Sequence, residues 1–248
     1  MGRRDDTARR DEIASALTAV RARLEAACRD AGRDPAEVTL LPVTKFFPAS
    51  DVRILYDLGC RGFGESREPE ASTKIAEFRA DSGVVDAVLW HMIGRLQRNK
   101  VKSVVRWADM VHSLDSVRLA DALDASVGAA RDAGTRSGPL EVLLQVSLDT
   151  DPARGGVAVA GVDALAAHVA ASPNLVLRGL MSVPPLDSDP DEAFGRLAVV
   201  QAGVLRDHPD ATVLSAGMTG DLEAAIRHGS TCVRVGTAIL GRRPIISE

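Results

Sequence analysis

The chain has 248 residues, of which 46% are apolar and 26% are charged. This composition is typical of a globular protein and excludes a disordered chain or one that lies mostly inside a membrane. The formal net charge is -4, so no overall basic field would attract nucleic acid or an anionic membrane, and we expect neither as a partner. The three cysteines, Cys28, Cys60 and Cys232, form no CxxC pair, which favours a reducing compartment.

The first eleven residues, 1–11, contain four arginines among acids and no apolar core. They do not resemble a secretory signal, and no later stretch is apolar for long enough to cross a bilayer. We therefore expect a cytoplasmic protein in which residues 1–11 are flexible. Between Ile13 and Ala31, apolar residues recur at steps of three and four, which predicts an amphipathic helix that ends near Gly32.

After this helix, short apolar runs alternate with helical patterns. The predicted strands are 39–44, 62–64, 88–93, 110–112, 141–147, 176–182, 212–215 and 232–236. The predicted helices are 50–58, 67–79, 96–106, 116–133, 161–171, 191–206 and 221–228. Most of the strand runs lack polar alternation, so both of their faces should be covered, as in a parallel sheet.

Eight strands with intervening helices, over a length close to the ~250 residues usual for the fold, predict an α/β chain folded as a (β/α)8 barrel of the TIM type. We expect one domain, 1–248, with an extra N-terminal helix. The alternative is an open doubly wound sheet, which the same alternation permits. The first turn from strand to helix carries no GxGxxG, so a dinucleotide-binding version of that alternative loses support.

In a barrel, the working residues lie at the carboxyl ends of the strands. After the seventh strand, residues 215–221 combine small residues and hydroxyls, and after the eighth Gly236 and Thr237 do the same. Small residues let backbone N–H groups approach an anion, and a helix N-terminus favours negative charge. These loops predict a phosphate site. The alternative is a pair of tight turns, with Thr219 or Asp221 as a helix N-cap.

Lys45 ends the first buried strand. An ammonium that projects into a closed pocket is poorly solvated, which lowers its pKa and produces the neutral amine that attacks an aldehyde. The alternative is a lysine that extends to solvent at the rim. A lysine opposite a phosphate site is a stronger signal than a lysine alone, because pyridoxal phosphate (PLP) requires both.

Arg234 lies on the last strand, two residues before Gly236, and could reach a ring held by that loop. An arginine that faces a pyridine nitrogen would oppose its protonation, because arginine keeps its own proton. The alternative is an arginine paired with a carboxylate of the barrel. His91 and His112 end neighbouring strands, but a third ligand at metal-binding spacing is absent from the sequence pattern, so they are interpreted as polar residues of the barrel.

Six stretches in family order, which together span most of the chain, carry a resemblance. They are 41–45, 62–67, 90–100, 179–185, 215–221 and 229–241. The sequence resembles the YggS/PROSC-type pyridoxal phosphate homeostasis proteins, which bind PLP in a barrel like the N-terminal domain of alanine racemase. This resemblance implies a carrier or buffer of PLP that takes part in vitamin B6 and amino-acid balance, with PLP-dependent apo-enzymes as partners.

For individual residues, the resemblance implies a Schiff base between PLP and Lys45, with Arg234 near the pyridine nitrogen. Met181 and His91 would line the pocket. Ser66 stands where the family usually has Asn, which puts an amide contact at that position in doubt. The phosphate would be held by Ser215, Thr219, Gly236 and Thr237 with neighbouring amides, including those of Gly217 and Met218.

Two functions are compared: a PLP-binding protein without efficient turnover, and a PLP-dependent amino-acid racemase. Racemisation needs proton donors on both faces of the substrate carbon. The related enzymes use a lysine of the barrel and a tyrosine that a second domain supplies. The single tyrosine, Tyr56, follows the first strand, and we expect no room for that domain after the last strand. The sequence therefore favours a non-catalytic monomer. A phosphate-binding barrel enzyme without PLP stays open if Lys45 is outside the pocket.

Overall fold

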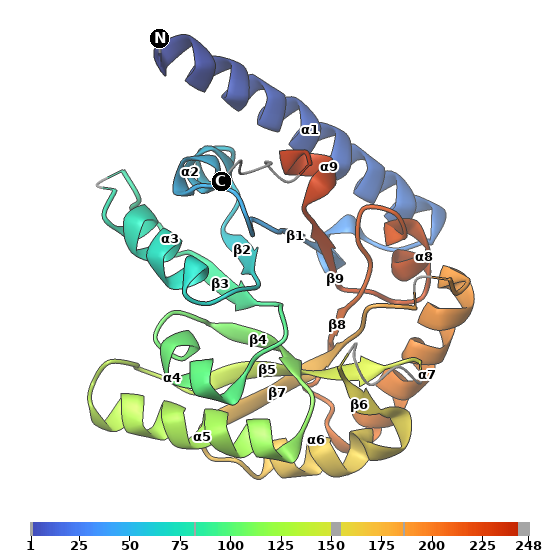
Figure 1. Ribbon diagram of the computed structural model, residues 1–248. Helices are drawn as coiled ribbons and strands as arrows, with labels where there is room; N and C mark the ends of the chain where they lie inside the picture. The colour runs from blue at the N-terminus through green and yellow to red at the C-terminus, as the bar shows by residue number, and fades with distance from the viewer. Residues whose placement is uncertain (1, 82, 150–154, 186, 243–248) are drawn as a thin grey trace.

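The computed structural model describes residues 2–81, 83–149, 155–185 and 187–242. Its eight main strands are all parallel and follow one another around a ring in the order β1-β9-β8-β7-β5-β4-β3-β2 (Figure 1). The ring closes where Val43, just after β1, pairs with Gly64 of β2. The strands are β1 (Thr39–Pro42), β2 (Gly62–Glu65), β3 (Leu89–Met92), β4 (Met110–Leu114), β5 (Leu140–Ser147), β7 (Leu175–Met181), β8 (Val213–Ser215) and β9 (Cys232–Val235). The predicted (β/α)8 barrel is thereby confirmed.

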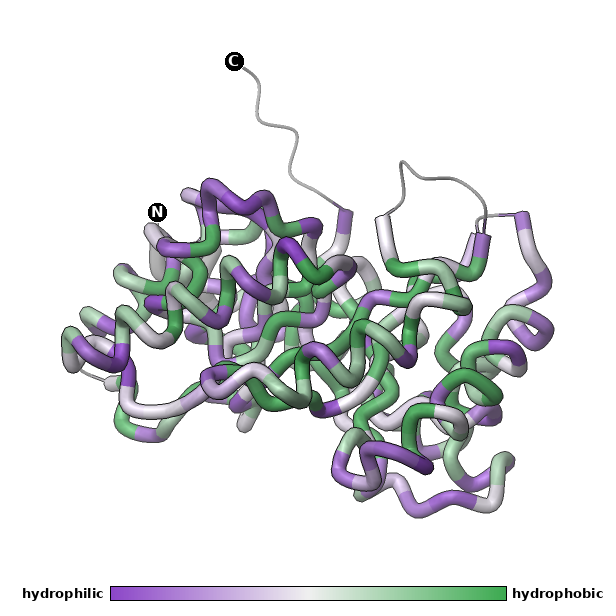
Figure 2. The backbone as a smooth tube through the Cα atoms, turned by 90° about the horizontal axis from the view of Figure 1, so that it is seen from below, coloured by the Kyte–Doolittle hydropathy of each residue, from purple (hydrophilic) through white to green (hydrophobic). Residues whose placement is uncertain are grey.

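Helices surround the ring of strands on its outside (Figure 1). They are α1 (Gly2–Asp30), α2 (Ala49–Asp57), α3 (Glu70–Arg79), α4 (Val101–Val104), α5 (Val117–Asp132), α6 (Val162–Ala170), α7 (Pro190–Asp207), α8 (Leu222–Arg227) and α9 (Thr237–Leu240). Hydrophobic and hydrophilic residues alternate at short intervals along the tube, as expected for helices that cover a sheet with one face (Figure 2). Within the described residues, no helix is both long and apolar enough to cross a membrane.

The structure differs from the sequence prediction mainly in short elements. The helix predicted at 96–106 is a 3-10 turn, Arg98–Lys100, followed by the single turn of α4, because the β-branched valines of this stretch form helix poorly. α3 begins at Glu70, after Pro69, which has no N–H to donate. Two unpredicted elements, β6 (Val157–Ala158, paired with β5) and α9, are too short to produce a periodic pattern.

Helix α1 is longer than predicted and runs along the outside of the barrel past α9 and α8 (Figure 1). It begins at Gly2, and Met1 lies outside the described residues. Arg9, near its start, joins it to two other helices. Its guanidinium donates to the carboxylate of Asp51 in α2 at 2.7 Å and to the carbonyl of Leu240 in α9 at 3.0 Å. The flexibility of residues 1–11 stays a prediction, and the contacts of Arg9 oppose it at the end of that stretch.

An aromatic cluster fills the space between the strands β2 and β3 and the helices α2 and α3. Phe63, Phe78 and Trp90 are buried, and their ring centroids lie 5.5–6.3 Å apart. Tyr56 extends the cluster at 5.8 Å from Phe78. Along β3, His91 alternates with Trp90 and therefore points into the barrel, whereas Glu65 lies two residues after Phe63 in β2 and shares its outward face, toward Lys74 of α3.

Candidate functional site

The barrel brings the predicted site loops together at one arc of its carboxyl end. Ser215 at the end of β8 pairs with Cys232 of β9, and Pro42 of β1 pairs with Val235 of β9. β8, β9 and β1 are therefore consecutive strands. The loops that follow them, which carry the predicted phosphate ligands and Lys45, lie side by side around the ring.

The β9 loop consists of Gly236 and the start of α9. A Cβ atom at Gly236 would lie 3.2 Å from the carbonyl oxygen of Val43, so the loop is pressed against the end of β1. Among the described residues, the amides of Gly236, Thr237 and Ala238 have no hydrogen-bond acceptor, as is usual for the first turn of a helix. These three donors, beside the end of β1, could bind an anion.

The β8 loop, residues 216–221, is a tighter turn. Gly217 has φ +91°, and a Cβ there would lie 2.6 Å from Ala225 of α8, so only glycine is accommodated. The amide of Met218 donates to the Asp221 carboxylate at 2.6 Å. Asp221 occupies the N-cap position of α8 but caps none of its amides. The alternative of a tight turn thus explains Gly217 and Met218, although its N-cap hydrogen bond from Asp221 is not formed. Thr219 is half-buried, and its contact with a phosphate stays a prediction.

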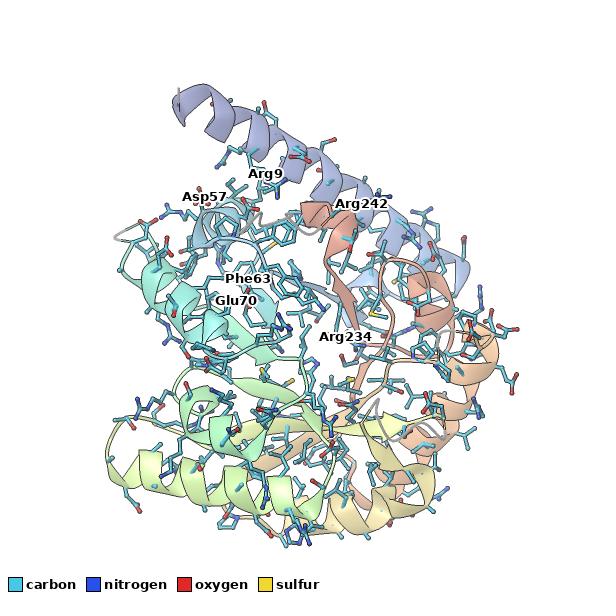
Figure 3. The ribbon with its side chains drawn as sticks, in the orientation of Figure 1. Arg9, Asp57, Phe63, Glu70, Arg234 and Arg242 are labelled. Atoms are coloured by element: carbon cyan, nitrogen blue, oxygen red, sulfur yellow. The ribbon has the colours of Figure 1, made fainter. Side chains whose placement is uncertain are left out.

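Arg234 is a buried cation with neutral partners. Its guanidinium lies inside the ring of strands (Figure 3) and donates to Ser215 Oγ at 2.6 Å and to the carbonyl of Ser182 at 2.9 Å. No carboxylate of the described residues forms an ion pair with it, so the alternative of a paired arginine does not hold. Burial lowers its pKa from the usual value for arginine. An uncompensated buried cation favours a nearby anion.

Ser215 and Met181 lie deeper than the loops. Ser215 is fully buried, and its hydroxyl lies between Arg234 and His112, at 3.0 Å from Nδ1 of the latter. The predicted contact of this hydroxyl with a phosphate therefore competes with two protein partners. Met181 ends β7 and is 2% exposed, next to Ser182, whose carbonyl binds Arg234.

Lys45 is exposed, so its amine is not in a closed, desolvating pocket, and the alternative of a lysine that extends to solvent at the rim describes its position. It lines a cavity of about 700 Å³ that is open to solvent, and its Nζ lies 5.9 Å from the ring centroid of Phe46. Ser66, as predicted, lines the same cavity. The other lining residues are Phe46, Arg67, Glu68, Pro69, Glu70, Met92, Gly94, Arg95, Leu96, Gln97 and Lys100.

The residues on both sides of Lys45 are held by a buried charged network that the sequence analysis missed. We call residues 44–46 the Lys45 turn. Lys74 donates to the carbonyl of Thr44 at 2.8 Å and to Glu65 Oε1 at 2.8 Å, and Thr44 Oγ1 donates to the same oxygen at 2.6 Å. On the other side, the Phe46 amide donates to Glu70 Oε1 at 2.7 Å.

Glu65 and Thr44 are the fully buried members of this network, and Glu65 carries its buried negative charge. Its Oε2 has no hydrogen-bond partner, and burial raises the pKa of its carboxyl group. The i,i+4 spacing of Glu70 and Lys74 on one helix was a signal for part of the network. Nothing in the sequence pairs Lys74 with Glu65, because this contact joins a strand to a helix.

His91 is the predicted site residue that the structure does not bring to this end. Its ring points into the barrel, where Nδ1 lies 2.9 Å from Nε2 of His112. Both rings line a cavity of about 310 Å³ together with Thr39, Met110 and other residues that begin strands, so the cavity is at the amino end. Across the described residues, no group of three or more His, Cys, Asp or Glu side chains is arranged to hold a metal ion.

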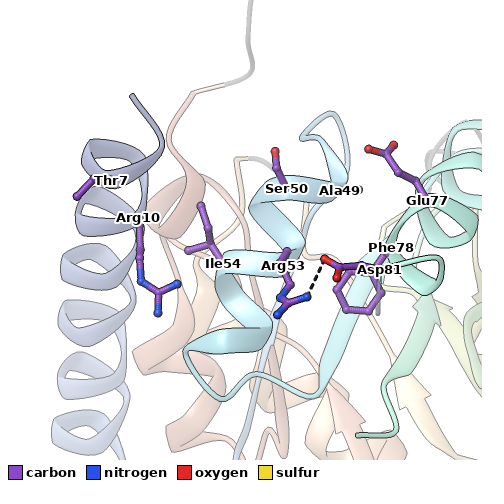
Figure 4. A pocket seen from close by; sticks show the side chains of 9 residues that line it. All are labelled: Thr7, Arg10, Ala49, Ser50, Arg53, Ile54, Glu77, Phe78 and Asp81. Atoms are coloured by element: carbon purple, nitrogen blue, oxygen red, sulfur yellow. Dashed lines mark ion pairs between the residues drawn. The ribbon is translucent and has the colours of Figure 1, made fainter. Parts of the chain in front are cut away.

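A further cavity of about 490 Å³ lies outside the barrel, between α1, α2 and α3 (Figure 4). Of its two cations, Arg53 is paired with Asp81 at 2.7 Å and with Asp57 at 2.9 Å, and Arg10 is paired with Asp57 at 3.2 Å. Because these charges are already neutralised by protein groups, this groove is a poorer candidate for an anion than the β9 loop.

The donors at the carboxyl end fit a ligand that carries both an aldehyde and a phosphate. Lys45 offers an accessible amine, the β9 loop offers three amides, and Arg234 adds a buried positive charge.

Comparisons with known proteins agree with this fit. The family model described as alanine racemase, N-terminal domain, matches residues 16–244. The pyridoxal phosphate homeostasis protein of Mycobacterium leprae is 53% identical over 94% of this chain and 93% of its own length. That of Escherichia coli K12 is 40% identical over 94% of this chain and 97% of its own length. The chain belongs to the pyridoxal phosphate homeostasis protein family.

Solved structures place this family member in the same fold group. PipY of Synechococcus elongatus, solved with PLP bound, has a TM-score of 0.78 and 31% identity over 93% of this chain and all of its own. A protein from Bifidobacterium adolescentis has a TM-score of 0.85 and 31% identity over 94% of this chain. Alanine racemase of Corynebacterium glutamicum, at 16% identity and a TM-score of 0.65, shares the fold, and this chain covers 63% of it.

Proposed function

We propose that this chain binds PLP at the carboxyl ends of β8, β9 and β1 and takes part in PLP homeostasis without efficient turnover. The observation that carries the proposal is the position of the Lys45 turn beside the free amides of the β9 loop, which follows from the pairing of β1 with β9. The names of the relatives and the PLP bound to PipY support it.

In this proposal, Lys45 forms a Schiff base with PLP, and the amides of Gly236 and Thr237, with the hydroxyl groups of Thr219 and Thr237, hold the phosphate. Bound PLP supplies an aldehyde carbon for the amine and an electron-withdrawing ring. Arg234 would face the pyridine nitrogen and would keep it unprotonated, because arginine retains its own proton. A ring of this kind is a poor electron sink, which suits storage better than catalysis.

The exposure of Lys45 fits a carrier. An accessible amine at the mouth of an open cavity can be loaded and unloaded without opening the barrel. We propose that PLP passes from this site to PLP-dependent apo-enzymes, and that the protein acts as a monomer in the cytoplasm.

The position of Tyr56 supports the absence of racemisation. Its hydroxyl accepts hydrogen bonds from the amides of Val85 and Asp86 at 3.0 and 2.8 Å, in the layer of helices outside the barrel. The chain has no other tyrosine that could act opposite Lys45. With PLP bound, alanine should therefore show no appreciable exchange of its α-hydrogen with solvent. Rapid exchange, followed by NMR in D2O, would favour the racemase instead.

The binding site is tested by borohydride reduction of the PLP-loaded protein and peptide mapping. The pyridoxyl mass should lie on the peptide that contains Lys45, and Lys45→Ala should abolish it. Lys100→Ala is the matched control, because Lys100 lines the same cavity, and this variant should keep the label. A pyridoxyl group on Lys100, or on any lysine other than Lys45, would overturn the proposed site.

A further inference from the structure

The side chains of His91, His112, Ser215 and Arg234 form a row of hydrogen bonds across the barrel interior, from β3 to β9, which we call the relay. Arg234 Nη1 donates to Ser215 Oγ at 2.6 Å, Ser215 Oγ lies 3.0 Å from His112 Nδ1, and His112 Nε2 lies 2.9 Å from His91 Nδ1. The other amino group of Arg234 is fixed by the carbonyl of Ser182. β4, which carries His112, and β8, which carries Ser215, are separated by β7 and β5 around the ring.

Arg234, at one end of the relay, determines which group donates and which accepts in each of its hydrogen bonds. A guanidinium only donates, so Ser215 Oγ accepts from it and its own hydrogen is available for His112 Nδ1. His112 then carries its hydrogen on Nε2 and donates it to His91 Nδ1. The other orientation of the Ser215 hydroxyl directs its hydrogen to the sulfur of Cys232, which is a weaker acceptor.

The electrostatics of the interior keep both imidazoles neutral, as this direction requires. Burial lowers the pKa of His91 to about 4. Burial, with the nearby His91 and the positive charge of Arg234, places the pKa of His112 well below its usual range. Among the other groups that face the relay, Cys232 has a pKa raised by burial and stays a thiol, and Glu37 lies at the mouth of the amino-end cavity.

We propose that Ser215, His112 and His91 are positioning residues that hold the Arg234 guanidinium in one orientation and connect it to the cavity at the amino end of the barrel. In this arrangement the Nε2–H of His91 is the free end of the relay, near Gly62 at the start of β2. An effect of the relay on a PLP ring rests on the proposed function, whereas the hydrogen bonds of the relay join groups of the protein and do not depend on it.

The first experiment measures histidine tautomers by 15N NMR of the full-length protein, labelled at histidine, before PLP is added. We expect both His91 and His112 to be neutral Nε2–H tautomers at pH 7, assigned through the signals lost in His91→Gln and His112→Asn. An Nδ1–H tautomer or a charged ring at either position would overturn the relay. His168, paired with Asp121 at the surface, serves as the reference.

The second experiment follows the Arg234 side chain in 15N-arginine-labelled protein. A guanidinium held on both amino groups rotates slowly and should give separate Nη–H signals, which Arg234→Lys removes. His112→Phe should merge these signals, His112→Asn should largely restore them because its amide oxygen can accept at the place of Nδ1, and His168→Phe should leave them unchanged. Separate signals in a folded His112→Phe protein would overturn the positioning role.

The last measurement connects the relay to the cofactor. His112→Phe should weaken PLP binding about five-fold, as expected for the loss of one buried hydrogen bond, and shift the absorbance of bound PLP in the same direction as Arg234→Lys does. Wild-type protein that fails to bind PLP would contradict the proposed function and leave both NMR results valid. Merged Arg234 signals with an unchanged spectrum and affinity would overturn the link to the ring.

Discussion

Two neighbouring regions of the barrel's carboxyl end are held in place by opposite means. The Lys45 turn is held by Lys74, Glu65 and Glu70 in the layer between β2 and α3. The side chains of Lys74 and Glu65 are buried, at 6% and 1% exposed. The loops after β8 and β9 are held from the outside by arginines of the N-terminal helix. Arg23 donates to the carbonyl of Thr219 at 2.6 Å, and Arg9 donates to that of Leu240 at 3.0 Å.

The difference separates a rigid part of the site from an adjustable one. Buried charges have lost their water and depend on one another, so the Lys45 turn has no alternative partners within its network. The arginines of α1 are partly exposed, and water or salt can replace their contacts at little cost. The structure thus fixes the backbone beside the amine more firmly than the loops proposed to bind phosphate.

The largest effect is expected at Lys74. Lys74→Met leaves Glu65 buried without its cation, and the free energy of unfolding should fall by about 3–5 kcal/mol in urea titrations. The double variant Glu65→Gln/Lys74→Met should recover a large part of this loss, because it removes the unpaired charge as well. A loss below about 1 kcal/mol for Lys74→Met would show that the network does not hold the Lys45 turn.

A smaller loss is expected in the β8 loop. Gly217→Ala places a Cβ at positive φ and 2.6 Å from Ala225, and should lower the free energy of unfolding by about 2–3 kcal/mol. Gly220→Ala in the same loop is the control, since no atom lies within 4 Å of its added Cβ. Equal unfolding midpoints for the two variants would contradict this account of the turn.

Acid and base should affect the two regions in opposite directions. Burial raises the pKa of Glu65, so its contribution to stability is present below its unfolded pKa and is lost as the pH rises through its folded pKa. The hydrogen bond from Arg23 lowers the pKa of Glu223, so that contribution is present above the unfolded pKa and is lost as the pH falls. Unfolding free energies of Glu65→Gln and Glu223→Gln, measured from about pH 2.5 to 8, should differ from wild type with opposite slopes. Slopes of the same sign would contradict the opposite pH dependence expected for the two regions.

The smallest effect is expected at Arg23. Arg23→Met should cost no more than about 1 kcal/mol of stability, and the cost should shrink at high salt, since the pair with Glu223 is partly exposed. PLP should bind a few-fold more weakly, because the carbonyl of Thr219 loses its anchor. Arg53→Met, which removes a comparable pair outside the barrel, should leave PLP binding unchanged. A matching loss of PLP affinity in Arg53→Met would show that the contact with Thr219 is not responsible.

The sequence predicted the barrel and the loops at its carboxyl end because both depend on local patterns. Apolar runs locate the strands, and parallel pairing places their ends together, so Lys45, Ser66, Thr219 and Gly236 could be assigned to this end of the barrel without coordinates. The predictions that failed concern the direction of single side chains, those of His91 and Lys45. His91 was expected beside PLP, but in β3 Trp90 packs among the outer aromatic rings, which directs its neighbour into the barrel. The exposure of Lys45 depends on the turn formed with Phe46.

The pairing of the first strand with the last also sets when the site can exist during synthesis. β1 leaves the ribosome early, yet its neighbour β9 ends at Val235, close to the end of the chain. A nascent chain carries Lys45 for most of its translation without the β9 loop beside it. The proposed site can therefore form only after β9 has been synthesised, because until then Lys45 has no β9 loop beside it.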